Sequence, residues 1–164
     1  MNIFQPPGTV LRYKVDGYWH YGILVHFGYV IHNSKVYGCV VKESYAHFAA
    51  GKTVTAYSGV SSANLGLACQ RAHQYIGSAY MLFTKNCEHF VRLAHGLIPE
   101  SPQIQKAVIT AAAGTVACIS SNRAVRLTAI GTSLAAALAP ENSSPIYVGL
   151  WGAITGFTFH LVSA

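Results

Sequence analysis

The stretch "HYGILVHFGYVIH", residues 20–32, decides which side chains can share one face of a β-sheet in this chain. Its aromatic and β-branched residues alternate with a period of two, which predicts two strands that turn at "HFG". A three-residue loop with Gly28 in the left-handed conformation pairs Val25 with Tyr29 and Gly22 with His32. A two-residue loop would shift the register by one and send the histidine rings to opposite faces.

The three-residue loop puts His20 and His32 on one face, as diagonal neighbours about 7–8 Å apart. That separation is within reach of a hydrogen bond between the two rings. Gly22 lies next to His20 on the same face, and we expect it to leave room for a substrate or for a helix that carries Cys87. The two histidines therefore form a candidate base and base-orienting pair that needs a nucleophile.

Further strands are expected on both sides of this hairpin, in segments rich in β-branched and aromatic residues. Helices are expected between and after them, so the first part of the chain is predicted to be α+β with an antiparallel meander. The predicted strands cover residues 9–15, 18–27, 29–33, 35–43 and 53–58.

Two helices are predicted from their end signals before the cysteine segment is reached. Ser44 is expected to cap a short helix over residues 45–50 that Gly51 ends. Ser62 is expected to cap a longer helix over residues 63–77, which ends at its final glycine.

The candidate nucleophile lies in "NCEHFVRLAHG", residues 86–96. Asn86 stands where a helix N-cap is expected, Cys87 is then the first helical residue, and Gly96 ends the helix. Unpaired N–H groups and the helix dipole favour the thiolate at that position. Glu88 would raise the thiol pKa, but adjacent helical positions diverge, so we expect its carboxylate to face away and to stabilise the first turn.

These residues together match the logic of a cysteine–histidine site. Cys87 attacks, His20 takes its proton, and His32 fixes the tautomer of His20. The backbone N–H of Cys87 is a candidate oxyanion donor, and Tyr18 or Tyr21 is a candidate for the second donor or for substrate contact.

Alternatives remain open at this point. Cys87 could be a structural residue at a helix start, and His89 is a rival base, although residues i and i+2 of a helix do not face one another. The remaining histidines are expected to be solvated or structurally satisfied: His26 at the turn, His47, His73 and His95 on helix surfaces, and His160 in an apolar tail.

Composition excludes several classes of function. Only 10% of the 164 residues are charged, 52% are hydrophobic, and the net charge is +6 without a dense Lys/Arg run. This argues against disorder and against a nucleic-acid module. The modest basic excess favours binding to an anionic membrane surface. The four cysteines, Cys39, Cys69, Cys87 and Cys118, show no CxxC spacing, so no disulfide framework, metal or cofactor is expected.

The composition changes over residues 97–105, which suggests a catalytic domain over residues 1–103 and an apolar helical tail over residues 104–164. The tail has three segments of about 16 to 20 residues, which is marginal against the ~20 apolar residues needed to span a bilayer. Small residues recur there at packing intervals and predict close helix contacts. We expect membrane insertion or a membrane-entering hairpin; a soluble or oligomer-forming helical subdomain is the alternative. The segments are 104–120, 124–139 and 145–164, and the small residues are Gly149, Gly152, Ala153 and Gly156.

The motifs "HYGILV" and "NCEHF", with His32 twelve residues after His20, resemble the lecithin:retinol acyltransferase family. That family includes small phospholipase/acyltransferases and bacterial and picornaviral relatives, and the resemblance covers roughly residues 6–105, including "KESYAHFAAGK". It implies a circularly permuted NlpC-type papain-like fold, with the histidine strands preceding the cysteine helix. It also implies acyl transfer, in which Cys87 takes an acyl group from a phospholipid as a thioester and passes it to an amine, alcohol or water.

The sequence therefore predicts a membrane-associated thiol acyltransferase or phospholipase A-type hydrolase. The N-terminus lacks the basic and apolar regions of a secretory signal, so an intracellular location is expected. A cysteine peptidase or amidase of the NlpC type is the second enzyme hypothesis. A membrane-remodelling or host-interaction protein, in which the tail carries the function, is the third.

Overall fold

The computed structural model describes residues 5–82, 84–140 and 152, and the chain divides into two compact units after Ser101. The N-terminal unit, Met1–Ser101, is α+β, as expected, and the C-terminal unit, Pro102–Ala164, is helical where it is described. The elements of the N-terminal unit are β1 (Val10–Val15), β2 (Tyr18–Val25), the 3-10 turn η1 (His26–Gly28), β3 (Tyr29–Ser34), β4 (Cys39–Ser44), α1 (Tyr45–Ala49), β5 (Thr55–Ala56), α2 (Leu65–Gln74) and α3 (Cys87–Ala94). Those of the C-terminal unit are α4 (Pro102–Ile119) and α5 (Arg123–Leu138).

The strands form one five-stranded sheet in the order β4-β3-β2-β1-β5, and all neighbours are antiparallel. The predicted meander is therefore confirmed, with β5 added beside β1. Strand β4 begins at Cys39 rather than at residue 35, because residues 35–38 form the turn and Gly38 takes a left-handed φ of 69° there.

The β2–β3 hairpin has the predicted register. Val25 pairs with Tyr29 and Ile23 with Ile31, across a loop in which Phe27 and Gly28 have φ values of 62° and 72°. The ladder between β2 and β3 stops at Ile23, whereas β2 stays paired with β1 as far as Tyr18. Residues 18–22 of β2 consequently have no ladder partner on the β3 side.

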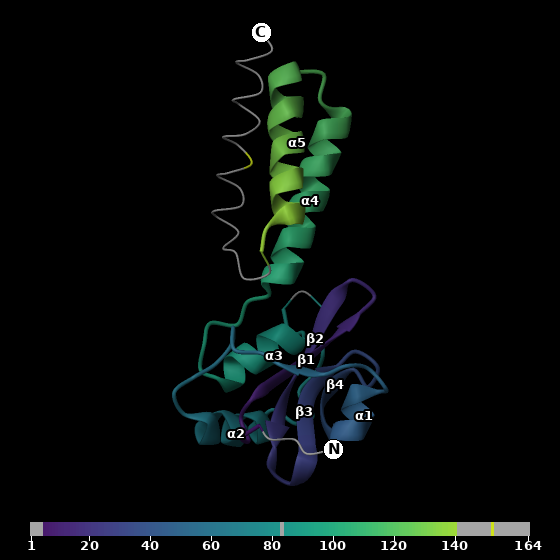
Figure 1. The fold of residues 1–164 in the computed structure, drawn as a ribbon. Helices are drawn as coiled ribbons and strands as arrows, with labels where there is room; N and C mark the ends of the chain where they lie inside the picture. The colour runs from purple at the N-terminus through teal and green to yellow at the C-terminus, as the bar shows by residue number, and fades with distance from the viewer. Residues whose placement is uncertain (1–4, 83, 141–151, 153–164) are drawn as a thin grey trace. The chain divides into compact units, whose positions relative to one another are not determined.

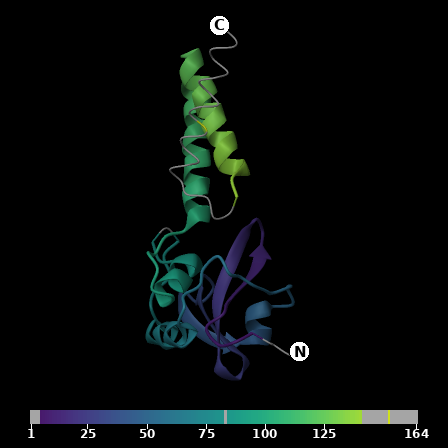
Figure 2. The same cartoon turned by 60° about the vertical axis from the view of Figure 1, so that its left-hand side comes forward.

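The two faces of the sheet are covered by different helices, as Figures 1 and 2 show. Helices α2 and α3 cover the face that carries Tyr21, Ile23 and Ile31. Helix α1 covers the other face, where its Phe48 packs with Leu24 on β2. His20 belongs to this second face, because side chains alternate along a strand.

Gly22 does not have the role that its position suggested. A Cβ there would lie 2.6 Å from Val30 Cγ1 and 2.9 Å from Phe48 Cε2. The space beside Gly22 is therefore filled by a β3 side chain and by α1, not by a substrate or by the Cys87 helix. The expectation failed because α3 lies on the opposite face of the sheet.

The helix caps agree with the sequence in two cases out of three. Ser44 accepts from the N–H of His47, and Asn86 accepts from the N–H groups of Glu88 and His89. For α2 the cap is Asn64, not Ser62, since Asn64 Oδ1 accepts from Leu67 N–H at 2.9 Å. Ser62 instead donates its N–H to a ring nitrogen of His95, so α2 begins later than predicted.

In the C-terminal unit, α4 and α5 lie side by side as a hairpin (Figures 1 and 2). Ser133 Oγ donates across it to the carbonyl of Thr110 at 3.2 Å. A Cβ on Gly152 would collide with the backbone of Thr132, which agrees with close contact at that small residue. The rest of the third predicted segment, 145–164, lies outside the described residues. Within the described part of the chain, no helix combines the length and apolar character needed to cross a membrane.

Candidate active site

His20 and His32 meet on the α1 face of the sheet. Nε2 of His20 and Nδ1 of His32 are 2.8 Å apart, and both side chains are buried. Phe48 of α1 packs on both rings, with centroid separations of 5.7 Å to His20 and 5.1 Å to His32. The hairpin register and the helix above it thus fix the two imidazoles against each other.

Glu43 extends this pair and was missed by the sequence analysis. Its Oε2 lies 2.9 Å from Nε2 of His32. His32 pairs with Val41 across the β3–β4 ladder, so Glu43 is a diagonal neighbour on the same face. The β3–β4 register would have identified it, but the sequence did not define the turn between those strands.

The hydrogen bonds define the tautomers. A carboxylate only accepts, so His32 donates from Nε2 to Glu43 and accepts at Nδ1 from Nε2–H of His20. Burial favours a raised pKa for Glu43, but hydrogen bonds from His32 and Tyr37 outweigh it and lower that pKa, which keeps the carboxylate ionised. Nδ1 of His20 is consequently the ring nitrogen that can accept a proton.

Both imidazoles are neutral near pH 7. Burial, followed by the neighbouring His32, lowers the pKa of His20 to about 3. Burial also lowers the pKa of His32, against the opposing hydrogen bond and charge of Glu43.

Cys87 lies at the N-terminus of α3, on the face of the sheet opposite His20. Its Sγ lies 3.9 Å from the carbonyl oxygen of Trp19, and the backbone N–H of Tyr21 hydrogen-bonds to the sulfur. Backbone groups at odd positions of β2 point toward β3, since those of Leu24 point to the β1 side. The sulfur therefore lies where β2 has no ladder partner, beside the two residues that flank His20.

The thiol is protonated at rest, contrary to the expectation from the helix dipole. Burial raises the pKa of Cys87 to about 12 and outweighs the N–H groups of Tyr21, Glu88 and Cys87 itself, which lower it. The charge of Glu88 raises it further. Glu88 is itself buried and accepts a 2.5 Å hydrogen bond from Ser101 Oγ. Its carboxylate therefore also connects α3 to the end of the N-terminal unit, besides its place in the first helical turn.

A cavity of about 400 Å³ opens on the α1 face, and its lining includes His20, His32 and Glu43. Tyr13 and Tyr18 also line it, and burial is the largest cause that raises the pKa of each phenol. Cys87 itself is 5% exposed and is not part of the lining.

The two candidate oxyanion residues, Tyr18 and Tyr21, are placed differently. Tyr18 is 44% exposed at the cavity. The side chain of Tyr21 is on the α3 face, where its hydroxyl hydrogen-bonds with Arg12. Its phenol is therefore excluded from the His20 face, and Tyr21 contributes its backbone N–H at the sulfur instead.

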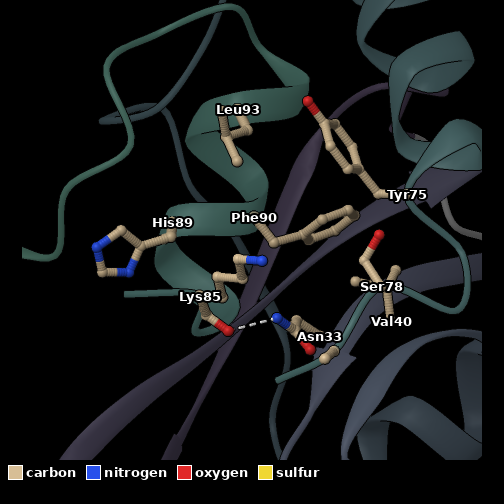
Figure 3. A pocket seen from close by; sticks show the side chains of 9 residues that line it. Asn33, Val40, Tyr75, Ser78, Lys85, His89, Phe90 and Leu93 are labelled. Carbon is tan, nitrogen blue, oxygen red and sulfur yellow. Dashed lines mark hydrogen bonds between the residues drawn. The ribbon is translucent and has the colours of Figure 1, made fainter. Parts of the chain in front are cut away.

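His89 lies away from the histidine pair, at a second cavity of about 120 Å³ between β3 and the helices α2 and α3 (Figure 3). Its ring is buried on the α3 face, whereas His20 faces α1. Asn33, the neighbour of His32, points into this region and donates from Nδ2 to the carbonyl of Lys85 at 2.7 Å. That hydrogen bond ties β3 to the segment that leads into Cys87.

The other histidines mostly follow expectation. His26 is exposed at the turn, and His73 bonds to the carbonyl of Cys69 within its own helix. His47 is exposed but reaches Oε1 of Glu43 at 3.3 Å. The expectation that His95 lies on a helix surface is wrong, because its side chain is 3% exposed and hydrogen-bonds with Ser62. His160 is outside the described residues.

Among the residues that the structure describes, no three His, Cys, Asp or Glu side chains are placed to hold a metal ion. No protein-family model matches the chain, and no curated protein matches it.

Proposed function

We propose that this protein is a cysteine-dependent acyltransferase or phospholipase A-type hydrolase of the lecithin:retinol acyltransferase family. The observation that carries the proposal is the 2.8 Å hydrogen bond between His20 and His32, on the strand segment whose backbone contacts the sulfur of Cys87. A thiol at a helix N-terminus, a neutral imidazole beside it and a second group that orients the imidazole are the parts that acyl transfer through a thioester requires. The circularly permuted NlpC-type fold is part of this proposal.

In the first half-reaction, Nδ1 of His20 takes the Cys87 proton as Sγ attacks the ester carbonyl of a phospholipid. The tetrahedral intermediate then breaks its C–O bond, and the imidazolium returns the proton to the leaving lysophospholipid oxygen. In the second half-reaction an amine, alcohol or water gives its proton to His20 and attacks the thioester carbonyl. The C–S bond then breaks, and the imidazolium returns the proton to the Cys87 sulfur. The backbone N–H groups of Cys87 and Tyr21, which hydrogen-bond to the resting sulfur, are suited to receive the developing oxyanion.

The resting protonation states constrain this mechanism. The raised pKa of Cys87 and the lowered pKa of His20 disfavour a standing thiolate–imidazolium pair. Proton transfer is therefore coupled to attack on bound substrate, as general-base catalysis. A buried, water-poor site strengthens the hydrogen bonds that stabilise the intermediate.

We further propose that the protein is intracellular and membrane-associated, with the C-terminal unit bringing it to the lipid surface and forming any homo-oligomer. Removal of residues 106–164 tests this assignment. We expect turnover of soluble short-chain esters to persist while binding to vesicles is lost. Vesicle binding that survives the truncation would assign the lipid contact to the N-terminal unit.

The decisive experiment for the chemistry is to incubate purified protein with phospholipid and to analyse Cys87 by mass spectrometry. We expect an acyl adduct on Cys87, and no turnover by Cys87→Ala. Cys69→Ala is the matched control, because it removes a buried thiol from α2, outside the site. If no adduct forms and no product depends on Cys87, the proposed function is wrong.

A further inference from the structure

The cavity in front of the histidines has two chemically different parts. Its inner end is formed by His20, His32 and Glu43, which are buried or half-buried and hydrogen-bonded to one another. Its outer part combines apolar side chains with two lysines, Lys35 and Lys52. A ligand that fits both parts has a reactive group at one end and a charged group a short distance away.

The two lysines come from separate loops that meet at this cavity. Lys35 is in the β3–β4 turn, and Lys52 follows α1. Both are exposed, and neither forms an ion pair with a described residue. Glu43 is the acidic residue among the described lining residues, and its carboxylate already accepts hydrogen bonds from His32 and Tyr37.

Charge therefore selects the ligand. The histidines at the inner end are neutral near pH 7, so two ammonium groups face a single, internally bonded carboxylate. An anion between the lysines gains charge-assisted hydrogen bonds, whereas a cationic group would be repelled. The whole chain, at a net charge of +6, adds to this preference.

The apolar lining indicates that the anion belongs to an amphiphile. Val36 is 90% exposed in the same turn as Lys35, and Tyr18, which also lines the cavity, is 44% exposed. Exposed side chains of this kind bury favourably against hydrocarbon, at roughly 25 cal/mol per Å². A volume of about 400 Å³ is in the range of pockets for small ligands, so it can hold the head and first part of such a molecule.

We propose that the outer part of this cavity, defined by Lys35, Lys52, Val36 and Tyr18, is a binding subsite for the anionic headgroup of a lipid acyl donor. The inference rests on the proposed function in that it places the ester of the same molecule at His20 and Cys87. It adds a specificity: the preferred donor carries net negative charge, as in phosphatidylglycerol, and a zwitterionic phosphatidylcholine is bound less well.

The test measures binding apart from turnover, with full-length Cys87→Ala protein. Dihexanoyl phosphatidylglycerol and dihexanoyl phosphatidylcholine are titrated as monomers, below their micelle concentrations, so that attraction of a basic chain to a charged surface does not contribute. We expect phosphatidylglycerol to bind more tightly than phosphatidylcholine. The double substitution Lys35→Gln/Lys52→Gln should reduce the ratio of the two affinities roughly threefold to tenfold. Lys14→Gln removes the same kind of charge from the opposite face of β1, where its amine lies 5.9 Å from the Trp19 ring, and should leave the preference unchanged.

Inorganic phosphate distinguishes a lipid subsite from a simple phosphate site. We expect it to compete weakly, and only when Lys35 and Lys52 are present. The inference is overturned if both lipids bind equally, if the double substitution has no larger effect than Lys14→Gln, or if free phosphate binds as tightly as the lipid. Binding with the expected preference but no Cys87-dependent turnover would keep the subsite and reject the proposed chemistry.

Discussion

Alkylation of Cys87 provides a direct test of the resting site. Burial raises the pKa of this thiol from an ordinary 9.0 to about 12, so its thiolate fraction at pH 7.5 falls about a thousandfold. A more basic thiolate is also a better nucleophile, and this raises the reaction rate by somewhat less than half of the thousandfold loss, measured on a logarithmic scale. We therefore expect iodoacetamide to react with Cys87 about 30- to 60-fold more slowly in the folded protein than in the denatured chain. The 5% exposure of the side chain will slow it further.

The assay is peptide mass spectrometry after timed alkylation of native and urea-denatured protein. Cys118 is exposed in α4 and serves as the internal reference, with similar rates in both states. The rate at Cys87 should keep rising with pH through pH 10, because the thiol titrates above that range. If native Cys87 reacts as fast as in the denatured chain, or levels off near pH 7, a thiolate–imidazolium pair exists at rest and our reasoning from burial is refuted.

Three further predictions concern folding free energy, measured by urea denaturation. Gly22→Ala should lower the free energy of unfolding by about 1–3 kcal/mol, because its Cβ would lie 2.6 Å from the nearest side-chain atom. Gly66→Ala in helix α2 should be neutral or stabilising, because its Cβ would make an ordinary 3.5 Å contact with Asn64 Oδ1. Equal effects of the two substitutions would contradict the packing. Ser101→Ala should lower the free energy of unfolding by about 1.5–3 kcal/mol, because it removes the hydrogen bond to the buried Glu88 carboxylate. A loss below about 0.5 kcal/mol, as for an ordinary surface substitution, would argue against this hydrogen bond. The folded-state pKa of His20 is lowered to about 3, so the unfolded state binds a proton first and the folding stability should fall as the pH drops below 6.5. His20→Gln should reduce the slope of stability against pH by up to about 1.4 kcal/mol per pH unit between pH 6 and 4. An unchanged slope would mean that His20 is not buried in its neutral form.

Local rules were sufficient for much of the fold. The hairpin register follows from alternation and a loop that Gly28 can close, and it brought His20 and His32 together as predicted. The start and end of α3 follow from the capping chemistry of Asn86 and Gly96. These features depend on neighbours within a few residues, so a sequence pattern can define them.

Other expectations were wrong where a residue suited to one local role forms a tertiary contact instead. Ser62 had the residue type of a helix cap, but its N–H bonds to His95, and Asn64 caps α2 instead. Gly22 had the right face for a ligand, but α1 covers that face. In both cases the local pattern was compatible with several partners, and packing selected one.

The sequence by itself determined the α+β pattern, the pairing of the two histidine strands and the position of Cys87 at a helix start. Only the tertiary structure decided that Glu43 completes the histidine pair, that the sulfur lies where β2 leaves β3, and that burial outweighs the helix terminus in the pKa of the thiol. The physical reason is that a strand register and a cap arise from short-range geometry. Solvent exposure and contacts between distant strands exist only once the whole chain has packed.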